Sequence, residues 1–78
     1  MEKLLKILAE IRPDVDFKNE KELIEDGILD SFDIVTIISA IDDEFNVAIR
    51  ITELKPENFN SAESIMKLID KLQNSIEL

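Results

Sequence analysis

The residues of this chain that could do chemistry gather in one segment, Glu25 to Ile34, which reads EDGILDSFDI. Near its end Ser31 follows Asp30, and Asp33 comes two residues later. The chain has no His and no Cys, so a Ser-His-Asp triad and a zinc site built on those ligands are excluded. It also has no G-x-S-x-G elbow, P-loop or dinucleotide-binding fingerprint. Ser31 is therefore a candidate for modification rather than an activated nucleophile.

Ser31 stands ahead of the longest helical pattern in the chain, and two interpretations of it stay open. A serine in such a place is most often an ordinary helix cap. However, Asp30 can itself serve as the cap, and a helix N-terminus is a natural seat for a phosphate ester. The residues alone leave Ser31 as either a cap or a site of modification.

The carboxylates could bind a metal ion, but their spacing does not fit a calcium loop. With Gly27 at the sixth position of an EF-hand, Ile24 falls at the third position, where a ligand is required. Asp42 and Asp43 are neighbours on a helix, so their side chains diverge, and a solvated face is the better interpretation of the pair. We expect no metal site and no catalytic residue, and hence no enzyme.

The charge of the chain is strongly negative and unevenly distributed. Its 78 residues include 9 basic and 18 acidic ones, for a net charge of −9, and no Lys or Arg lies between Lys21 and Arg50. This interval forms either a solvated face or a docking surface for basic partners, and its concentration of acid around Ser31 favours docking. Nucleic-acid binding is not expected, because phosphates would be repelled. The acidic residues of the interval are Glu22, Glu25, Asp26, Asp30, Asp33, Asp42, Asp43 and Glu44.

No apolar run reaches membrane-spanning length, and residues 1–12 carry too many charges for a signal peptide. We expect a cytoplasmic monomer without direct membrane insertion. The 45% apolar share is mostly Ile and Leu, which suggests an aliphatic core in a single domain over residues 1–78.

The elements that must position Ser31 begin with a helix over residues 2–11, which Pro13 ends. Residues 12–30 then lack a long periodic segment but are too apolar for disorder, so we expect a long loop packed over the core. Gly27, the only glycine, is expected to supply a positive-φ turn just before the serine.

The helix that starts at Ser31 is expected to run to Phe45. Asp30 is its predicted N-cap, Asp33 a partial capping-box partner, and Asn46 a left-handed stop. Its core-facing stripe consists of Ile34, Ile37, Ile38, Ile41 and Phe45.

Phe32 and Val35 lie off this stripe, beside the acidic residues. Either Phe32 tucks under the long loop, or the two form a small apolar patch, ringed by acid, on which a partner docks. These interpretations are evenly balanced on the residues alone.

The segment after Asn46 alternates and is β-branched, but it has no strand partner. We expect it to be an extended connector that inserts Val47, Ile49 or Ile51 into the core.

Two further helices complete the expected fold. Pro56 suits the first position of a short helix through Phe59, which anchors it. Ser61 is a good N-cap for a last helix over about residues 62–74, and the tail after Gln73 is expected to fray. The fold class is therefore all-α, with three longer helices and a short third one.

At residues 26–32, DGILDSF, the sequence resembles the acyl carrier protein family. The mark of that family is Asp-Ser-Leu or Asp-Ser-Met at the start of its second helix. Here the tripeptide is Asp30-Ser31-Phe32, whose third residue is still apolar. The resemblance covers nearly the whole chain and implies a four-helix acyl-carrier-like bundle.

The resemblance implies that Ser31 carries a 4'-phosphopantetheine arm, attached from coenzyme A by a phosphopantetheinyl transferase, whose terminal thiol holds cargo as a thioester. Asp30 flanks the attachment site, and Asp30 and Asp33 would engage basic residues of the transferase. The surface that partner proteins recognise would comprise Phe32, Asp33, Val35, Asp42 and Asp43.

The subclass and the cargo stay open. The run DGILDS at residues 26–31 is similar to the DGLLDS typical of D-alanyl carrier proteins, which receive D-alanine from an adenylating ligase. We therefore expect a stand-alone acyl or aminoacyl carrier, with aminoacyl cargo slightly favoured. Its partners would be the transferase, an activating ligase and downstream acyltransferases with basic docking surfaces. The alternatives are a fatty-acid or polyketide synthesis carrier and, from another class, a small acidic adaptor without a prosthetic group.

Overall fold

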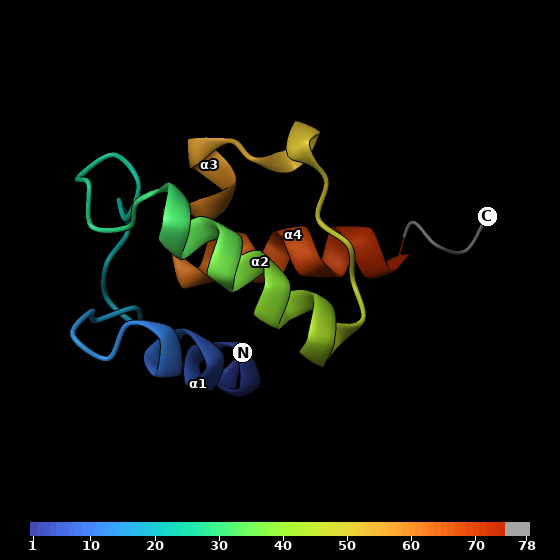
Figure 1. Cartoon of the computed structure of the whole chain (residues 1–78), viewed down its shortest axis with the longest axis horizontal. Helices are drawn as coiled ribbons and strands as arrows, with labels where there is room; N and C mark the ends of the chain where they lie inside the picture. The colour runs from blue at the N-terminus through green and yellow to red at the C-terminus, as the bar shows by residue number, and fades with distance from the viewer. Residues whose placement is uncertain (75–78) are drawn as a thin grey trace.

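The structure, a computed structural model, describes residues 1–74, none of which lies in a strand (Figure 1). The expected fraying after Gln73 falls mostly on residues outside the described ones, and the last helix continues to Asn74. The order of elements confirms the predicted all-α fold with three longer helices, a short third helix and a long first loop. These elements are α1 (Glu2–Ile11), α2 (Ser31–Phe45), the 3-10 turn η1 (Ile51–Glu53), α3 (Pro56–Phe59) and α4 (Ala62–Asn74).

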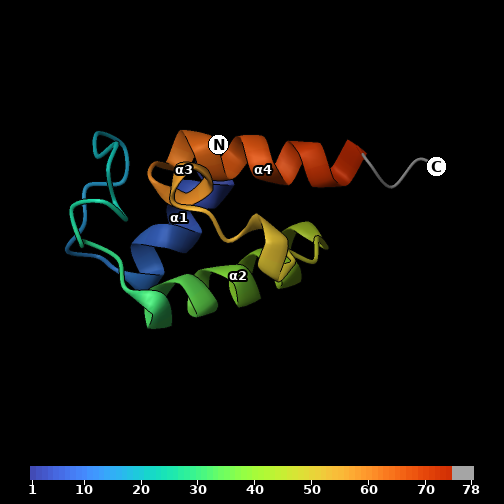
Figure 2. The ribbon, with the colours of Figure 1, turned by 90° about the horizontal axis from the view of Figure 1, so that it is seen from above.

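Helices α1 and α2 run side by side in opposite directions, and the long loop joins them at one end of the molecule (Figure 1). Seen from above, α4 lies across the core from α2, and α3 packs beside the start of α4 (Figure 2). None of the helices in the described part of the chain is long and apolar enough to cross a membrane.

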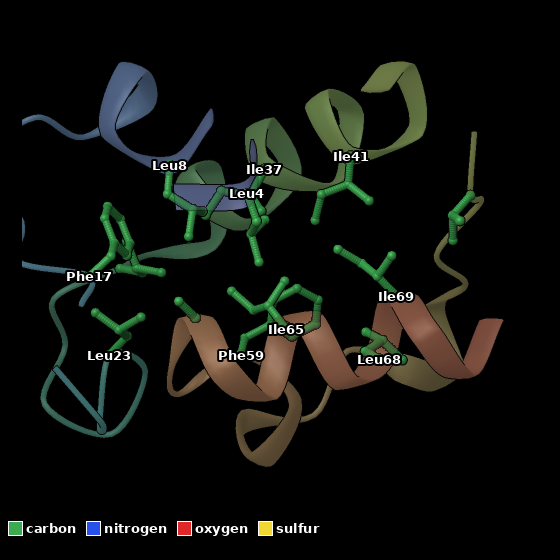
Figure 3. Packing of buried hydrophobic residues seen from close by; sticks show 13 residues of the cluster. Leu4, Leu8, Phe17, Leu23, Ile37, Ile41, Phe59, Ile65, Leu68 and Ile69 are labelled. Atoms are coloured by element: carbon green, nitrogen blue, oxygen red, sulfur yellow. The ribbon is translucent and has the colours of Figure 1, made fainter. Parts of the chain in front are cut away.

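The core is aliphatic apart from two phenylalanines, and every helix contributes to it (Figure 3). In α2 the expected stripe faces inward: Ile37 and Ile41 are fully buried, and the other three members are partly buried against the core. The buried side chains are Leu4, Ile7, Leu8, Phe17, Leu23, Leu29, Ile37, Ile41, Val47, Phe59, Ala62, Ile65, Leu68 and Ile69.

The long loop is packed as the sequence predicted. Its side chains Phe17, Leu23 and Leu29 are buried in the same cluster as the helices. This burial fixes the path of the loop toward Ser31, because an apolar side chain in the core holds its own backbone in place.

Three side chains of the connector after α2 were candidates for insertion into the core, and only one of them is fully buried. Val47 is buried and Ile49 half-buried, whereas Ile51 is 85% exposed. Asn46 adopts the expected left-handed conformation, with φ of 55°, and ends α2.

Both C-terminal helices begin where the sequence predicted. Pro56 opens α3, and the buried Phe59 anchors it. At α4 the Ser61 hydroxyl accepts a 3.0 Å hydrogen bond from the Ser64 N–H, and the Ser64 hydroxyl accepts one of 3.1 Å from the Ser61 N–H. This reciprocal pair confirms Ser61 as the cap.

Candidate functional site

The start of α2 is fixed by a complete capping box. The Asp33 N–H donates to Asp30 Oδ1 at 2.9 Å, and the Asp30 N–H donates to Asp33 Oδ2 at 3.2 Å. The hydrogen bond from the Asp33 N–H lowers the pKa of Asp30 below its usual value, because it stabilises the carboxylate. The capping box that the sequence predicted in part is therefore present in full.

Ser31 is the first residue of α2, and its side chain is exposed. Asp30 is the N-cap, so the interpretation of Ser31 as the cap is wrong. No other residue in the range 1–74 forms a hydrogen bond with the Ser31 hydroxyl. The serine is thus held by its backbone alone, with its oxygen open to an approaching molecule.

Arg12, just after α1, contacts residues on both sides of Ser31 in sequence, and this role was not anticipated from the sequence. Its Nη1 donates to Asp33 Oδ2 at 2.6 Å and to the Ile28 carbonyl at 3.1 Å. Its Nε and Nη2 each donate to the Asp14 carboxylate at 3.0 Å. The hydrogen-bonded ion pair between Arg12 and Asp14 lowers the pKa of Asp14 and raises the pKa of Arg12. Arg12 therefore ties the end of α1 to both the loop and α2.

The loop before Ser31 is held from its other side by Asn60, at the junction of α3 and α4. The Asn60 side-chain oxygen accepts hydrogen bonds from the Ile24 N–H at 3.0 Å and the Glu25 N–H at 3.2 Å. The Asn60 carbonyl accepts a third from the Leu23 N–H at 2.8 Å. Gly27 then turns the chain with φ of 72°, which confirms the predicted positive-φ turn.

The opposite end of the α1–α2 pair is joined by Lys3. Its ammonium donates to the Glu44 carbonyl at 3.1 Å and lies 3.7 Å from the Glu44 carboxylate. The same group lies 5.2 Å from the centre of the Phe45 ring. A cation thus links α1 to α2 at each end of α2. Arg12 bonds to the start of α2, and Lys3 bonds to its end.

The residues predicted to form the partner face fall into two groups. Phe32 is 78% exposed and Val35 62% exposed, so the interpretation in which Phe32 tucks under the loop is wrong. Asp42 and Asp43 are also exposed. Asp33 differs, because it is only 8% exposed and its carboxylate is bonded to Arg12 and to the Asp30 N–H. Its burial favours a structural role over the partner contact that we expected.

Among residues 1–74, no group of three or more His, Cys, Asp or Glu side chains is arranged to hold a metal ion.

Comparison with known proteins identifies the family. The chain is 42% identical over 71 residues to an acyl carrier protein of Buchnera aphidicola subsp. Baizongia pistaciae, and the match covers 88% of each chain. It is 32% identical over 74 residues to a D-alanyl carrier protein of Bacillus licheniformis, covering 92% of this chain and 95% of the relative.

The chain belongs to the acyl carrier protein family.

It is accordingly a carrier protein, as the resemblance of its motif implied. A D-alanyl carrier protein of Bacillus subtilis is similar at 31% identity over 74 residues. No model of a protein family matches the chain. Acyl carrier proteins use a phosphopantetheine prosthetic group and work with partner ligases and transferases.

The start of α2 suits such a group. Ser31 offers an exposed hydroxyl, and it opens a helix of 15 residues whose N-terminal dipole favours a negatively charged phosphate ester. Two carboxylates lie close to the serine in sequence. That of Asp33 is paired with Arg12, whereas that of Asp30 forms no ion pair with any residue in the range 1–74.

Proposed function

We propose that this carrier bears its 4'-phosphopantetheine arm on Ser31. The main support for the proposal is that Asp30, and not Ser31, caps α2. Asp30 performs the capping, and the adjacent serine hydroxyl is left exposed and without a bond to any residue in the range 1–74. A serine that served only the helix would be expected to use its hydroxyl on the backbone.

In the attachment step, the Ser31 oxygen forms a bond to the phosphorus of coenzyme A that carries the pantetheine. The pyrophosphate bond of coenzyme A breaks, adenosine bisphosphate leaves, and the serine proton passes to the transferase or to water. The positive end of the α2 dipole favours the phosphodiester charge that results. Once attached, the arm supplies a terminal thiol that holds cargo as a thioester.

The exposed part of α2 is the surface that we propose for partner docking. Phe32 and Val35 supply an apolar centre close to the serine, and Asp42 and Asp43 supply negative charge further along the helix. Apolar centres with a polar rim are typical of protein interfaces. The negative charge suits transferases, ligases and acyltransferases with basic docking surfaces.

The experiment that tests the attachment is intact-protein mass spectrometry. The purified protein is incubated with coenzyme A and a broad-specificity phosphopantetheinyl transferase, beside Ser31→Ala and Ser39→Ala variants. Ser39 is the matched control, because it is an exposed serine on the same helix. We expect one added phosphopantetheine on the parent and on Ser39→Ala, and none on Ser31→Ala. A parent that is folded but unmodified would overturn the proposal.

For the cargo, we propose D-alanine, with a fatty-acyl or polyketide intermediate as the alternative. The matches to relatives named D-alanyl carrier protein and to a relative named acyl carrier protein all cover most of the chain. The motif at residues 26–31 favours the first group.

A loading assay separates these cargoes. The phosphopantetheinylated protein is offered D-alanine, ATP and a D-alanine-activating ligase, or malonyl-coenzyme A and a malonyl transferase. Addition of one alanyl group in the first assay alone supports the D-alanyl function. Loading in the second alone would assign the protein to acyl-chain synthesis.

A further inference from the structure

We infer that Arg12 is a positioning residue for the modification of Ser31. It holds the first turn of α2, and with it the serine hydroxyl, in the orientation that the transferase uses. This inference rests on the proposed function of Ser31. It concerns a residue that lies 19 positions before the serine in sequence and outside the family motif.

Arg12 joins three segments of the chain at one point. Its guanidinium makes hydrogen bonds to Asp14 just after α1, to the Ile28 carbonyl in the loop and to Asp33 in α2. A planar guanidinium with a fixed fork of donors sets the relative orientation of the groups it bonds. Arg12 thereby holds the end of the loop against the first turn of α2.

These bonds are made to residues on both sides of the serine in sequence. Asp33 Oδ2 accepts from both Arg12 Nη1 and the Asp30 N–H, so one carboxylate oxygen links the guanidinium to the residue directly before Ser31. The Ile28 carbonyl, held by the same Nη1, lies three residues before the serine. The Ser31 side chain has no hydrogen bond of its own within residues 1–74. Its position therefore depends on the backbone that these bonds hold in place.

The Arg12–Asp33 contact is partly shielded from solvent. The two side chains are 29% and 12% exposed, in contrast to 57% and 52% for the Lys3–Glu44 pair at the other end of α1. Charge-assisted hydrogen bonds of this length in partly buried sites hold their geometry better than exposed ion pairs do. The Arg12 contact therefore restricts motion near the serine, whereas the exposed Lys3 contact at the other end of α1 does not.

A positioning role differs measurably from two others. If Arg12 only stabilised the fold, its loss would leave the modification rate unchanged at temperatures where the protein stays folded. If Arg12 touched the transferase directly, its loss would weaken docking and leave the maximal rate intact. A positioning residue instead affects the maximal rate, because misplacement of a reacting group slows the step that follows binding.

The experiment measures single-turnover modification of Ser31 with the transferase in excess. It gives a maximal rate constant and the transferase concentration at half of that rate, for the parent and for Arg12→Gln and Lys3→Gln. Lys3→Gln is the matched control, because it removes the same charge and also a link between α1 and α2, but at the far end of α2. Thermal melts by circular dichroism verify that each variant is folded at the assay temperature.

For Arg12→Gln we expect the maximal rate constant to fall by about tenfold with the half-saturating concentration nearly unchanged. Lys3→Gln is expected to match the parent in both quantities. Arg12→Lys should recover part of the rate, since an ammonium can still reach one of the acceptors but lacks the fork. A maximal rate for Arg12→Gln equal to that of the parent, or a change only in the half-saturating concentration, would overturn the inference.

A double variant tests the route through Asp33. In the Asp33→Asn background, Arg12→Gln should slow modification much less than it does in the parent, because the two residues act through one contact. Fully additive effects would contradict this route. If the parent itself gains no phosphopantetheine, the proposed function of Ser31 fails and this inference with it. If the parent is modified and Arg12→Gln is modified equally fast, only the inference fails.

Discussion

The guanidinium of Arg12 lies 2.6 Å from the carboxylate of Asp33, and this contact couples the end of α1 to the first turn of α2. Asp33 also completes the capping box with Asp30. Asp33 therefore has two structural roles: it helps to cap the start of α2, and it connects α2 to α1. Both roles place the backbone of Ser31, which lies between the two aspartates.

The shared role of Asp33 predicts a large effect of its removal on stability. Asp33→Ala leaves the partly buried Arg12 guanidinium and the Asp30 N–H without their acceptor. We expect the free energy of unfolding to fall by about 1–3 kcal/mol, measured by urea denaturation. Asp42→Ala, which changes an exposed aspartate of the same helix, should stay within roughly 0.5 kcal/mol of the parent. Equal losses in the two variants would contradict the structural role of Asp33.

The core of α2 predicts a sharp contrast between two isoleucines. Ile41 is fully buried, so Ile41→Val should lower the free energy of unfolding by about 0.5–1.5 kcal/mol. Ile51 is 85% exposed, so Ile51→Val should change it by less than roughly 0.5 kcal/mol. The two variants delete the same methyl group, and denaturation curves measured side by side compare them. A cost at Ile51 as large as that at Ile41 would show that the connector packs differently.

The helix boundaries could be predicted from the sequence because their determinants are local. Asp30 and Asp33 stand three residues apart around the start of α2, Asn46 ends it, and Pro56 and Ser61 open the two following helices. Each signal acts within about one turn of its own helix, so a single sequence is enough to recognise it.

The contacts that hold the loop could not be predicted, because they join residues far apart in the chain. Arg12 and Asp33 are 21 positions apart, and Asn60 and Ile24 are 36 apart. Neither spacing follows from a helical period, and Arg12 carried no signal beyond its place at a helix end. The exposure of Phe32 was likewise undecided, since periodicity does not say whether a loop covers a residue next to the core stripe.

The cap at α2 predicts a specific dependence of stability on pH. Hydrogen bonding to the Asp33 N–H lowers the folded-state pKa of Asp30. A carboxyl group with a lowered pKa adds stability above its unfolded pKa of about 3.9, and loses that contribution as the pH falls through the folded value. The melting temperature of the parent should therefore exceed that of Asp30→Ala most clearly near neutral pH.

This difference in melting temperature should shrink as the pH is lowered below about 4, because the parent then loses its charged cap. Melts in a series of buffers between neutral and strongly acidic pH measure it. A difference that stays constant over the whole range would mean that the charge of Asp30 does not contribute to the cap. Glu10→Ala, on the exposed face of α1, provides a baseline for the loss of one negative charge.

The docking surface that we propose on α2 predicts a salt-dependent association with the transferase. The rate constant of association should fall as the ionic strength rises, because salt screens attraction between exposed charges. Replacing Asp42 and Asp43 together with Asn should slow association at low salt and weaken its salt dependence. A double variant of Glu2 and Glu10 to Gln carries the same net charge change on α1 and should behave like the parent. Stopped-flow measurements in which both double variants behave alike would contradict docking on α2.

Peptide mass spectrometry can locate the residue that carries the arm, which we propose is Ser31. The parent protein is modified with coenzyme A and the transferase, digested, and its peptides are fragmented. We expect a phosphopantetheine group on Ser31 and on no other serine of the chain. A group found on Ser39, Ser61, Ser64 or Ser75, or a fully folded protein with no group at all, would contradict this assignment.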